Sequence, residues 1–202
     1  MSADNVQILA KTTEYQGYFR IDAYQLRHRL HRGGLTGDIR REVFERGRAA
    51  AVLLYDPGLD SVVLVEQFRI GALSAGENPW VVEIVAGIIE EGETAPEVAR
   101  REALEEAGCT VTDLLPIHDY LVSPGCSSET VSMFCGRVDA SGAGGVHGLA
   151  EENEDIRALV MPADRAIADL RNRRFNNALP IIALQWLALE RDAIRRLWLT
   201  TP

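Results

Sequence analysis

Lysine is almost absent from this sequence of 202 residues. Only Lys11 is a lysine among the 21 basic residues, and 30 acidic residues give a formal net charge of −9. An acidic chain lacks the basic surface with which proteins bind nucleic acids and anionic membranes. We therefore expect neither a nucleic acid nor a membrane as a partner.

Cysteine is also scarce. The three cysteines, Cys109, Cys126 and Cys135, form no C-x-x-C pair and have no zinc-type spacing with the four histidines. We expect reduced, structural thiols. His118 and His147 have no partners at ligand spacing, so we expect them to be structural or solvated.

A targeting segment is not evident in the sequence. Residues 1–16 lack a basic stretch followed by an apolar one, and no apolar run is long enough to span a bilayer. These features predict a cytoplasmic protein.

Hydrophobic residues are plentiful, at 47% of the chain, which indicates a globular protein with one good core or a main domain with a small appendage. Residues 1–47 contain short, loosely alternating apolar stretches that favour strands but supply too small a core to stand alone. We predict a small N-terminal β-rich domain at 1–47 and a main domain at 48–202.

The main domain alternates strand and helix patterns without the regular βαβ repeat of a doubly wound fold. Strand patterns cover residues 49–56, 61–68, 80–87, 117–122, 131–138 and 156–161, and helical patterns cover 95–107, 162–172 and 180–199. This order predicts the α+β class, with a mixed β-sheet sandwich that carries helices on its faces. From their helical spacing, we expect Trp186, Leu187 and Leu189 to lie in the core.

The first helix has clear end signals. Thr94 with Glu97 three residues later forms a capping-box pattern, and Gly108 is a typical C-terminal stop. At about 100° per residue, four alanines share one face of this helix. Glu102 and Glu106 lie along the edge of that face, so they border the buried side.

Three glutamates crowd the end of this helix. Glu102 and Glu106 are four residues apart, where like charges repel, and Glu105 lies between them near a helix C-terminus that disfavours anions. One interpretation is a solvated charged face, in which Arg101 pairs with Glu97 and Glu105. The other is a ligand that offsets the repulsion, such as a divalent cation bound by carboxylate oxygens.

The segment GIIEEGETAPEVARREALEEAGC, residues 87–109, resembles the Nudix box. The fixed positions of that motif are occupied by Gly87, Glu93, Arg101, Glu102, Glu105, Glu106 and Gly108. Ala103 takes an aliphatic position, and Cys109 is a small departure at the last position. Seven matches at fixed spacing are a specific signal. In the Nudix family, this motif forms a loop, a helix and a loop whose glutamates bind Mg²⁺ or Mn²⁺.

The resemblance implies a role for each of these residues. Glu102 and Glu106 would be the principal Mg²⁺ ligands, with Mn²⁺ as a substitute, and Ala86 would add a backbone carbonyl. Glu105 would be an additional or water-mediated ligand. Arg101 would orient the ligands together with Glu93, and we include Arg101 and Glu105 among the catalytic residues.

Further segments resemble the bacterial ADP-ribose pyrophosphatases of this family, from about residue 15 to residue 195. They are FERG at 44–47, EQFR at 66–69, SPGCSSE at 123–129, GVHGLAEENEDIR at 145–157 and IIALQWLALE at 181–190. Pro124, about fifteen residues after the box, matches the mark of this subgroup. The fold expected from the resemblance is a Nudix-type sheet with helices.

The acidic loop AEENED has two interpretations. In isolation, such a run is typical of a mobile, solvated loop. The resemblance instead implies that Glu152 is the catalytic base and Glu154 a further metal ligand, with neighbouring glycines that let the loop close over substrate. Glu151 remains an alternative for the base.

The resemblance also implies a site for a small nucleoside diphosphate sugar, completed by the partner subunit of a homodimer. Tyr18 and Phe19 would stack on the adenine, and Arg41 and Glu42 would come from the partner. Ordinary packing in the strand core is the alternative for the two aromatic residues.

Two arginines and one loop complete the expected substrate site. Arg46 and Arg69 would bind the diphosphate, although surface salt bridges are equally typical of arginines in an acidic protein. Four residues would border the terminal ribose: Ser123, Pro124, Gly125 and Glu129. In isolation, a Pro-Gly pair predicts only a turn.

The function implied is Mg²⁺-dependent hydrolysis of ADP-ribose to AMP and ribose 5-phosphate. The nearest alternative is another nucleoside diphosphate sugar, such as GDP-mannose or ADP-glucose, because one motif serves many substrates. A non-catalytic nucleotide-sugar-binding regulator and a structural acidic module are alternatives from other classes.

Overall fold

The computed structural model describes residues 5–200, apart from the side chain of Glu152. The chain forms two compact units. The first comprises Met1–Arg48 and Tyr120–Thr130, and the second comprises Ala49–Asp119 and Val131–Pro202.

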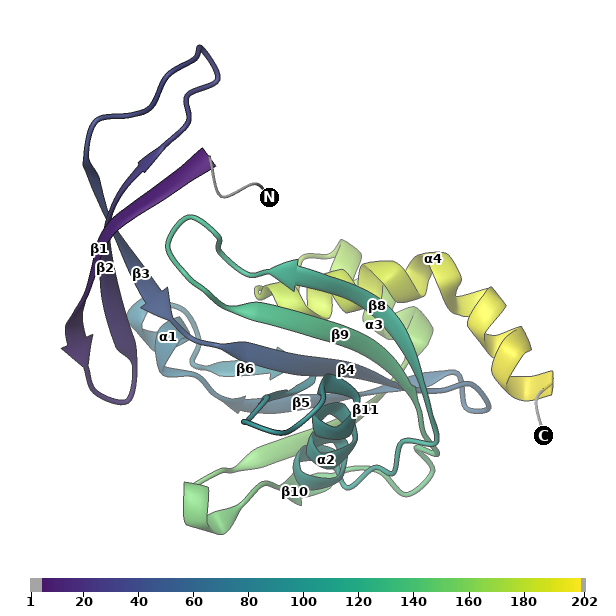
Figure 1. Ribbon diagram of the computed structural model, residues 1–202. Helices are drawn as coiled ribbons and strands as arrows, with labels where there is room; N and C mark the ends of the chain where they lie inside the picture. Colours follow the sequence, from purple (N-terminus) through teal and green to yellow (C-terminus); the bar gives the residue numbers. More distant parts are fainter. Residues whose placement is uncertain (1–4, 201–202) are drawn as a thin grey trace. The chain divides into compact units, whose positions relative to one another are not determined.

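The first unit contains a three-stranded antiparallel sheet in the order β1-β2-β3 (Figure 1). The strands are β1 (Val6–Gln16), β2 (Arg20–His28) and β3 (Ile39–Glu45). Every residue of β1 is exposed. A sheet of this size with one wholly exposed strand buries too little apolar surface to be stable alone.

The segment Tyr120–Thr130 joins this unit through backbone hydrogen bonds to the end of β3. Phe44 donates its N–H to the Cys126 carbonyl at 2.8 Å and accepts the Ser128 N–H at 3.1 Å. The side chain of Ser128 reinforces the junction, because its Oγ accepts the Arg46 N–H at 3.0 Å. This loop is therefore fixed to β3, although the two segments are far apart in the sequence.

The second unit is built on an eight-stranded sheet whose main path is β10-β11-β5-β4-β9-β8. Its strands are β4 (Arg48–Asp56), β5 (Ser61–Phe68), β6 (Trp80–Glu83), β7 (Val85–Ile88), β8 (Asp113–Leu121), β9 (Thr130–Arg137), β10 (Gly145–His147) and β11 (Ile156–Pro162). The expected α+β class, with a sheet and helices, is confirmed.

The sheet forks beside the hairpin of β4 and β5. These strands pair with each other only next to their turn, from Leu54 to Asp56. Farther along, β4 pairs with β7 and β5 pairs with β6. The prediction of one strand over 80–87 was wrong in this respect, because the buried residue Ile84 interrupts it and the two halves have different partners.

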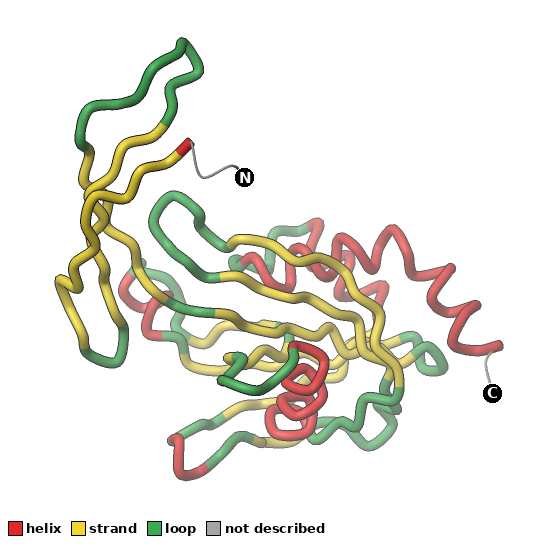
Figure 2. Tube along the Cα trace, in the orientation of Figure 1, coloured by secondary structure: helices red, strands yellow, loops and turns green. Residues whose placement is uncertain are grey.

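Helices cover both faces of this sheet, as Figure 2 shows in red. They are α1 (Ile70–Ser74), α2 (Ala95–Ala107), α3 (Ala163–Arg171) and α4 (Ala178–Thr200). On one face, the alanine side of α2 packs on Ala50, Val52 and Leu54 of β4. On the other face, Tyr55 of β4 contacts Trp198 of α4, with ring centroids 6.4 Å apart. The strand is buried from Ala50 to Asp56 because it is covered on both faces.

The C-terminal helix is fastened to the turn between β4 and β5 by one carboxylate. Asp60 accepts hydrogen bonds from the Tyr55 hydroxyl at 2.6 Å and from Nε of Arg191 at 2.8 Å. Arg195 lies 3.2 Å from the same carboxylate. The arginine hydrogen bonds hold the pKa of Asp60 below its usual value, although its partial burial opposes the shift.

One expectation about the last helix needs correction. Of the three residues predicted in the core of the last helix, Leu187 is fully buried, but Leu189 is 83% exposed. The helix is apolar around much of its circumference, so spacing alone did not identify the covered face. All three cysteines are free thiols; Cys109 and Cys135 are buried, as expected of structural thiols, whereas Cys126 is exposed.

Among residues 5–200, no helix is long and apolar enough to cross a membrane.

Candidate functional site

Helix α2 begins and ends where its sequence signals predict. The Glu97 carboxylate accepts hydrogen bonds from the backbone N–H of Thr94 at 2.9 Å and from its hydroxyl at 2.6 Å. At the other end, Gly108 adopts a left-handed conformation with φ 63°. These caps fix the register of the helix, and hence the direction in which its glutamates project.

Glu106 is the most buried of these glutamates, with 4% of its surface exposed. Its Oε2 accepts the backbone N–H of Ala86, on β7, at 3.2 Å. Burial raises the pKa of Glu106 to about 8, and the nearby carboxylates of Glu102 and Glu154 add to the shift, whereas Ala86 and Arg69 oppose it. A buried carboxylate with acidic neighbours is a strong candidate for cation binding.

Glu102 lies against the backbone of β7 at Gly87. A Cβ atom at position 87 would come within 1.8 Å of Glu102 Oε1, so only glycine leaves space for this carboxylate. Burial raises the pKa of Glu102, and Arg101 opposes that shift. The glycine of the motif therefore provides the close approach of strand and helix.

Arg101 forms salt bridges with three carboxylates of this cluster. Its guanidinium lies 2.8 Å from Glu102, 3.0 Å from Glu105 and 3.1 Å from Glu93. The two interpretations of these glutamates, a solvated Arg–Glu face and a ligand cluster, are thus compatible. The same arginine forms salt bridges on the exposed edge of the cluster and orients the carboxylate of Glu102. Glu105 is the less buried member and belongs to that edge.

The loop that follows β10 brings a further carboxylate to α2. Glu154 is partly buried and lies close enough to raise the pKa values of Glu102 and Glu106. Its Oε2 accepts the Leu149 N–H at 3.1 Å. The predicted base, Glu152, has its side chain outside the described residues.

In the described part of the chain, no three His, Cys, Asp or Glu side chains already stand grouped as a metal site. The donors nevertheless fit a hard divalent cation, because buried Glu106, Glu102 and Glu154 all present oxygen. Burial and the neighbouring carboxylates raise the pKa of Glu106 despite the nearby charge of Arg69, so a bound cation would favour its ionised form.

Arg69 lies in the same unit, at the start of α1. Its Nε pairs with Oε2 of the buried Glu83 at 2.7 Å, and its charge lowers the pKa of Glu106. The expected salt bridge therefore exists, and the same arginine is close to the carboxylate cluster. Sequence reasoning missed Glu83, although a glutamate at the end of a buried strand was a detectable signal.

The first unit gathers several predicted substrate residues. Arg46 lies over the Phe19 ring at 4.8 Å and 3.6 Å from the Glu129 carboxylate. Tyr18 is 87% exposed and meets Phe19 edge-on at 4.8 Å, so these residues are not strand core. The aromatic pair and the two charged groups therefore form one local cluster.

The structure adds two residues to this cluster. Phe44 contacts Phe19 at 5.0 Å, and Ser128 bonds the Arg46 backbone. Both were missed because their partners are distant in sequence. The remaining predicted substrate residues, Arg41, Glu42, Ser123, Pro124 and Gly125, are all exposed. Arg41 donates to the Arg40 carbonyl, and Ser123 accepts backbone bonds that close the predicted turn.

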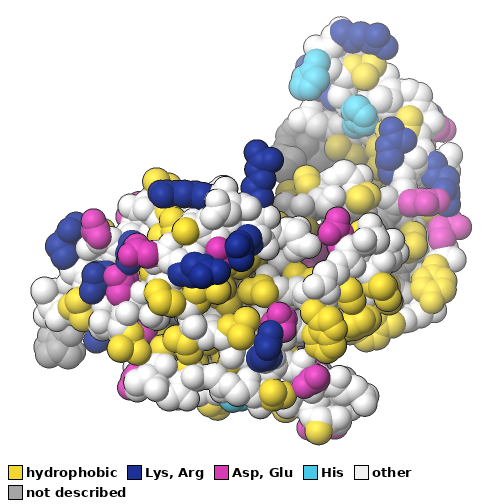
Figure 3. All heavy atoms as spheres, turned by 180° about the vertical axis from the view of Figure 1, so that it is seen from behind, with side chains coloured by type: hydrophobic (Ala, Val, Ile, Leu, Met, Phe, Trp, Pro, Cys, Tyr) yellow, Lys and Arg dark blue, Asp and Glu magenta, His cyan; other side chains and the backbone are white. Residues whose placement is uncertain are grey.

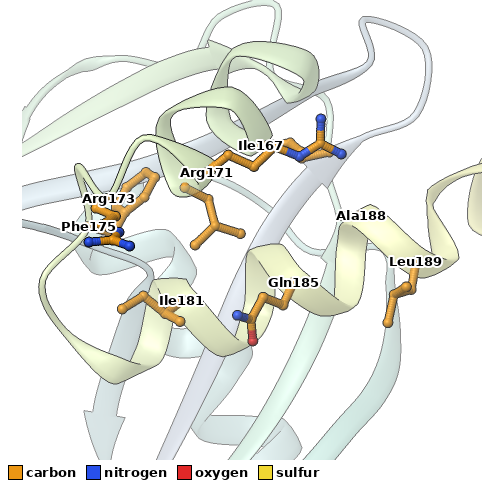
Figure 4. Close-up of a pocket in the computed structure, with 9 residues that line it drawn as sticks. Ile167, Arg171, Arg173, Phe175, Ile181, Gln185, Ala188 and Leu189 are labelled. Atoms are coloured by element: carbon orange, nitrogen blue, oxygen red, sulfur yellow. The ribbon is translucent and has the colours of Figure 1, made fainter.

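A hollow with a volume of about 590 Å³ lies elsewhere, between α3 and α4 (Figure 4). Its lining is mainly apolar and consists of Ile167, Leu170, Arg171, Arg173, Phe175, Ile181, Gln185, Ala188 and Leu189. Figure 3 shows hydrophobic side chains among arginines on this side of the molecule. Since no carboxylate lines the hollow, we do not assign the chemistry to it.

Comparisons with known proteins agree with this geometry. The ADP-ribose pyrophosphatase of Escherichia coli strain K12 is 49% identical over 195 residues, covering 96% of this chain and 93% of the relative. The Haemophilus influenzae protein of the same name is 41% identical, covering 98% and 92%. A GDP-mannose pyrophosphatase from Cronobacter sakazakii is 37% identical, covering 92% and 96%.

A solved structure and a family model complete the comparison. The crystal structure of an ADP compounds hydrolase matches with a TM-score of 0.73 at 19% identity, covering 96% of this chain and 99% of that one, which supports the fold. The model of the NUDIX domain matches residues 45–183, which include the glutamate helix and the acidic loop. The chain therefore belongs to the Nudix family.

Proposed function

We propose that this chain is an enzyme, an ADP-ribose pyrophosphatase that hydrolyses ADP-ribose to AMP and ribose 5-phosphate. The observation that carries the proposal is the buried Glu106 beside Glu102, at the glycine that Glu102 requires. The substrate is inferred from nearly full-length similarity to relatives that bear this name.

Magnesium is the proposed cofactor, with Mn²⁺ as a substitute. Glu102, Glu106, Glu154 and the carbonyl of Ala86 would hold the cation. When bound, it would neutralise charge on the diphosphate and lower the pKa of a bound water. Arg101 supports the site by holding Glu102 and Glu105 in position through hydrogen bonds at 2.8 and 3.0 Å.

The chain's own residues carry the remaining steps. Glu152 would accept the proton of the attacking water, so that the water oxygen gains hydroxide character as it attacks the phosphorus. Arg69 and Arg46 would bind diphosphate oxygens as planar donors. Charge neutralisation of this kind makes a covalent nucleophile unnecessary.

The sugar and base would contact the first unit. Phe19 and Tyr18 offer exposed aromatic surface for the adenine, and Arg46 is already ordered against Phe19. The terminal ribose would border Glu129 and the turn of Ser123, Pro124 and Gly125, which is fixed to β3.

We further propose a cytoplasmic homodimer, in which residues 1–47 provide dimerisation and substrate binding and residues 48–202 form the hydrolase domain. The wholly exposed β1 supports the proposal, because a partner would cover its apolar residues. Arg41 and Glu42 of one subunit would then contribute to the site of the other.

Two observations bear on the alternatives. The similarity to a GDP-mannose pyrophosphatase makes GDP-mannose the competing substrate, and ADP-glucose belongs to the same class. A structural acidic module would have no need for the buried Glu106 beside a second carboxylate, Glu102, that is held against Gly87, so the retained carboxylates favour a catalyst.

The test is a substrate panel of ADP-ribose, GDP-mannose and ADP-glucose with Mg²⁺, followed by chromatography of the nucleotide products. We expect ADP-ribose to be preferred. Glu106→Gln and Glu152→Gln should each lower kcat by about 100-fold or more, and only Glu106→Gln should also weaken Mg²⁺ binding in calorimetry. Glu190→Gln, an exposed site on α4, is the control. Full activity in both site variants would refute the assignment.

A further inference from the structure

The strand before the acidic loop, β10, is attached to the end of the metal-binding helix. The backbone N–H of Gly148 donates a hydrogen bond to the carbonyl of Glu105 at 3.1 Å. Glu105 is in the last turn of α2, where carbonyls have no partner within the helix. A loop residue therefore completes the hydrogen bonding of the helix that carries Glu102 and Glu106.

A histidine ring lies at the same junction. His147 is partly buried, and its Nε2 donates to the carbonyl of Gly144 at 2.8 Å. A Cβ atom at position 108 would lie only 2.7 Å from its Cε1, so the ring packs on the helix-terminating Gly108. Gly108 thus fulfils two requirements, a left-handed backbone and space for the imidazole.

The acidic loop starts directly beyond this junction. Gly148 has φ +101°, and a Cβ there would come within 2.7 Å of the Glu154 Cβ, so the chain doubles back closely at this residue. The Leu149 N–H then donates to Glu154 Oε2, and the Glu154 N–H donates to the Leu149 carbonyl at 3.2 Å. The position of Glu154 follows from the position of Gly148.

We infer that His147 is a positioning residue, which fixes the acidic loop to the end of α2 and so sets the distance between Glu154 and the glutamates of the helix. Sequence spacing gave this histidine no role. The inference rests on the proposed function, since it explains how that site is assembled. His147 itself need not touch substrate.

Removal of the ring should affect catalysis more than folding. We expect His147→Ala to lower kcat by roughly 10- to 100-fold and to raise the Mg²⁺ concentration for half-maximal activity, as is typical when supports of metal ligands are lost. KM for substrate should change less than threefold, because no predicted substrate-binding side chain is altered. His147→Gln retains a donor for the Gly144 carbonyl and should restore most of the rate.

A double-mutant cycle makes the test specific. Gly108→Ala places a methyl against the ring and also strains the left-handed backbone, and only the first effect needs His147. Its effect on kcat should therefore be several-fold smaller in the His147→Ala background. Equal effects in both backgrounds would contradict the positioning role of the contact between His147 and Gly108.

Hydrogen exchange of the Gly148 amide tests the attachment without reference to activity. We expect at least about tenfold faster exchange in His147→Ala than in the wild type, since local opening of the junction becomes easier. If the wild type hydrolyses no substrate of the panel, the proposed function is wrong. The exchange measurement still tests the attachment in that case, and equal exchange rates of the Gly148 amide in the wild type and His147→Ala would contradict it. If the wild type is active and His147→Ala keeps its kcat within twofold, the positioning role alone is wrong.

Discussion

Replacement of Glu106 by glutamine should stabilise the metal-free protein in a pH-dependent manner. In the folded state, burial and neighbouring carboxylates raise the pKa of Glu106 from its ordinary 4.5 to about 8. The folded protein therefore binds more protons than the unfolded chain between these two pH values. By linkage, the unfolding free energy contributed by this group falls as pH rises through that window.

The expected size follows from the same shift. Each pKa unit corresponds to about 1.4 kcal/mol. Between pH 5 and pH 8, the unfolding free energy of the wild type should fall by about 3 kcal/mol because of this group. Glu106→Gln has no ionisable group at this position and should not show this fall. The absolute stability of the variant also reflects the imperfect fit of the amide. The informative quantity is therefore how the difference in unfolding free energy between variant and wild type changes with pH.

Chemical denaturation in the presence of EDTA, at pH values from 5 to 8, measures this difference. Saturating Mg²⁺ should then stabilise the wild type much more than the variant, since a ligand that binds only the folded state raises its stability. Glu190→Gln, at an exposed site, should show a constant difference from the wild type. A difference for Glu106→Gln that stays constant or shrinks as pH rises would refute the reasoning.

Three other substitutions give separate tests. Gly87→Ala places a methyl within 1.8 Å of Glu102 Oε1, so Mg²⁺-dependent kcat should fall more than about tenfold; an unchanged Mg²⁺ titration would contradict this. Asp60→Asn should lower the unfolding free energy at pH 7 by about 2 kcal/mol, because the pKa of Asp60 is lowered by Arg191. That stability is present above the ordinary pKa and is lost as pH falls through the lowered one, so urea curves of variant and wild type should converge in acid, and a constant gap would count against it. Thr94→Ala removes the cap of α2 and should cost about 1 kcal/mol in thermal unfolding, whereas no loss would mean that the cap contributes little.

The helix of the site could be predicted closely because its signals are local. Thr94 and Glu97 define its start, and Gly108 defines its end, all within one short segment. The spacing of Glu102 and Glu106 then determined that both project along one side. Such features depend on neighbouring residues and need no knowledge of the rest of the fold.

Features that depend on tertiary partners could not be predicted in the same way. The run Trp80–Gly87 is apolar except for Glu83, and nothing in it indicates that the strand partner changes at Ile84. Helix α1 and strand β10 are too short for a periodic pattern. The contact of Arg46 with Glu129 joins segments more than eighty residues apart, and its contact with Phe19 joins the ends of two different strands, which no local pattern encodes.

The forked sheet has a consequence for synthesis on the ribosome. When β4 and β5 have emerged, their shared turn pairs only Leu54–Asp56 with Ser61–Val63, and the rest of both apolar strands has no partner until Trp80–Ile88 follows. The outer edge of β5 waits longer still, for β11. A nascent chain ending near Asn78 would thus expose several strand edges at once, the condition under which association between chains competes with folding.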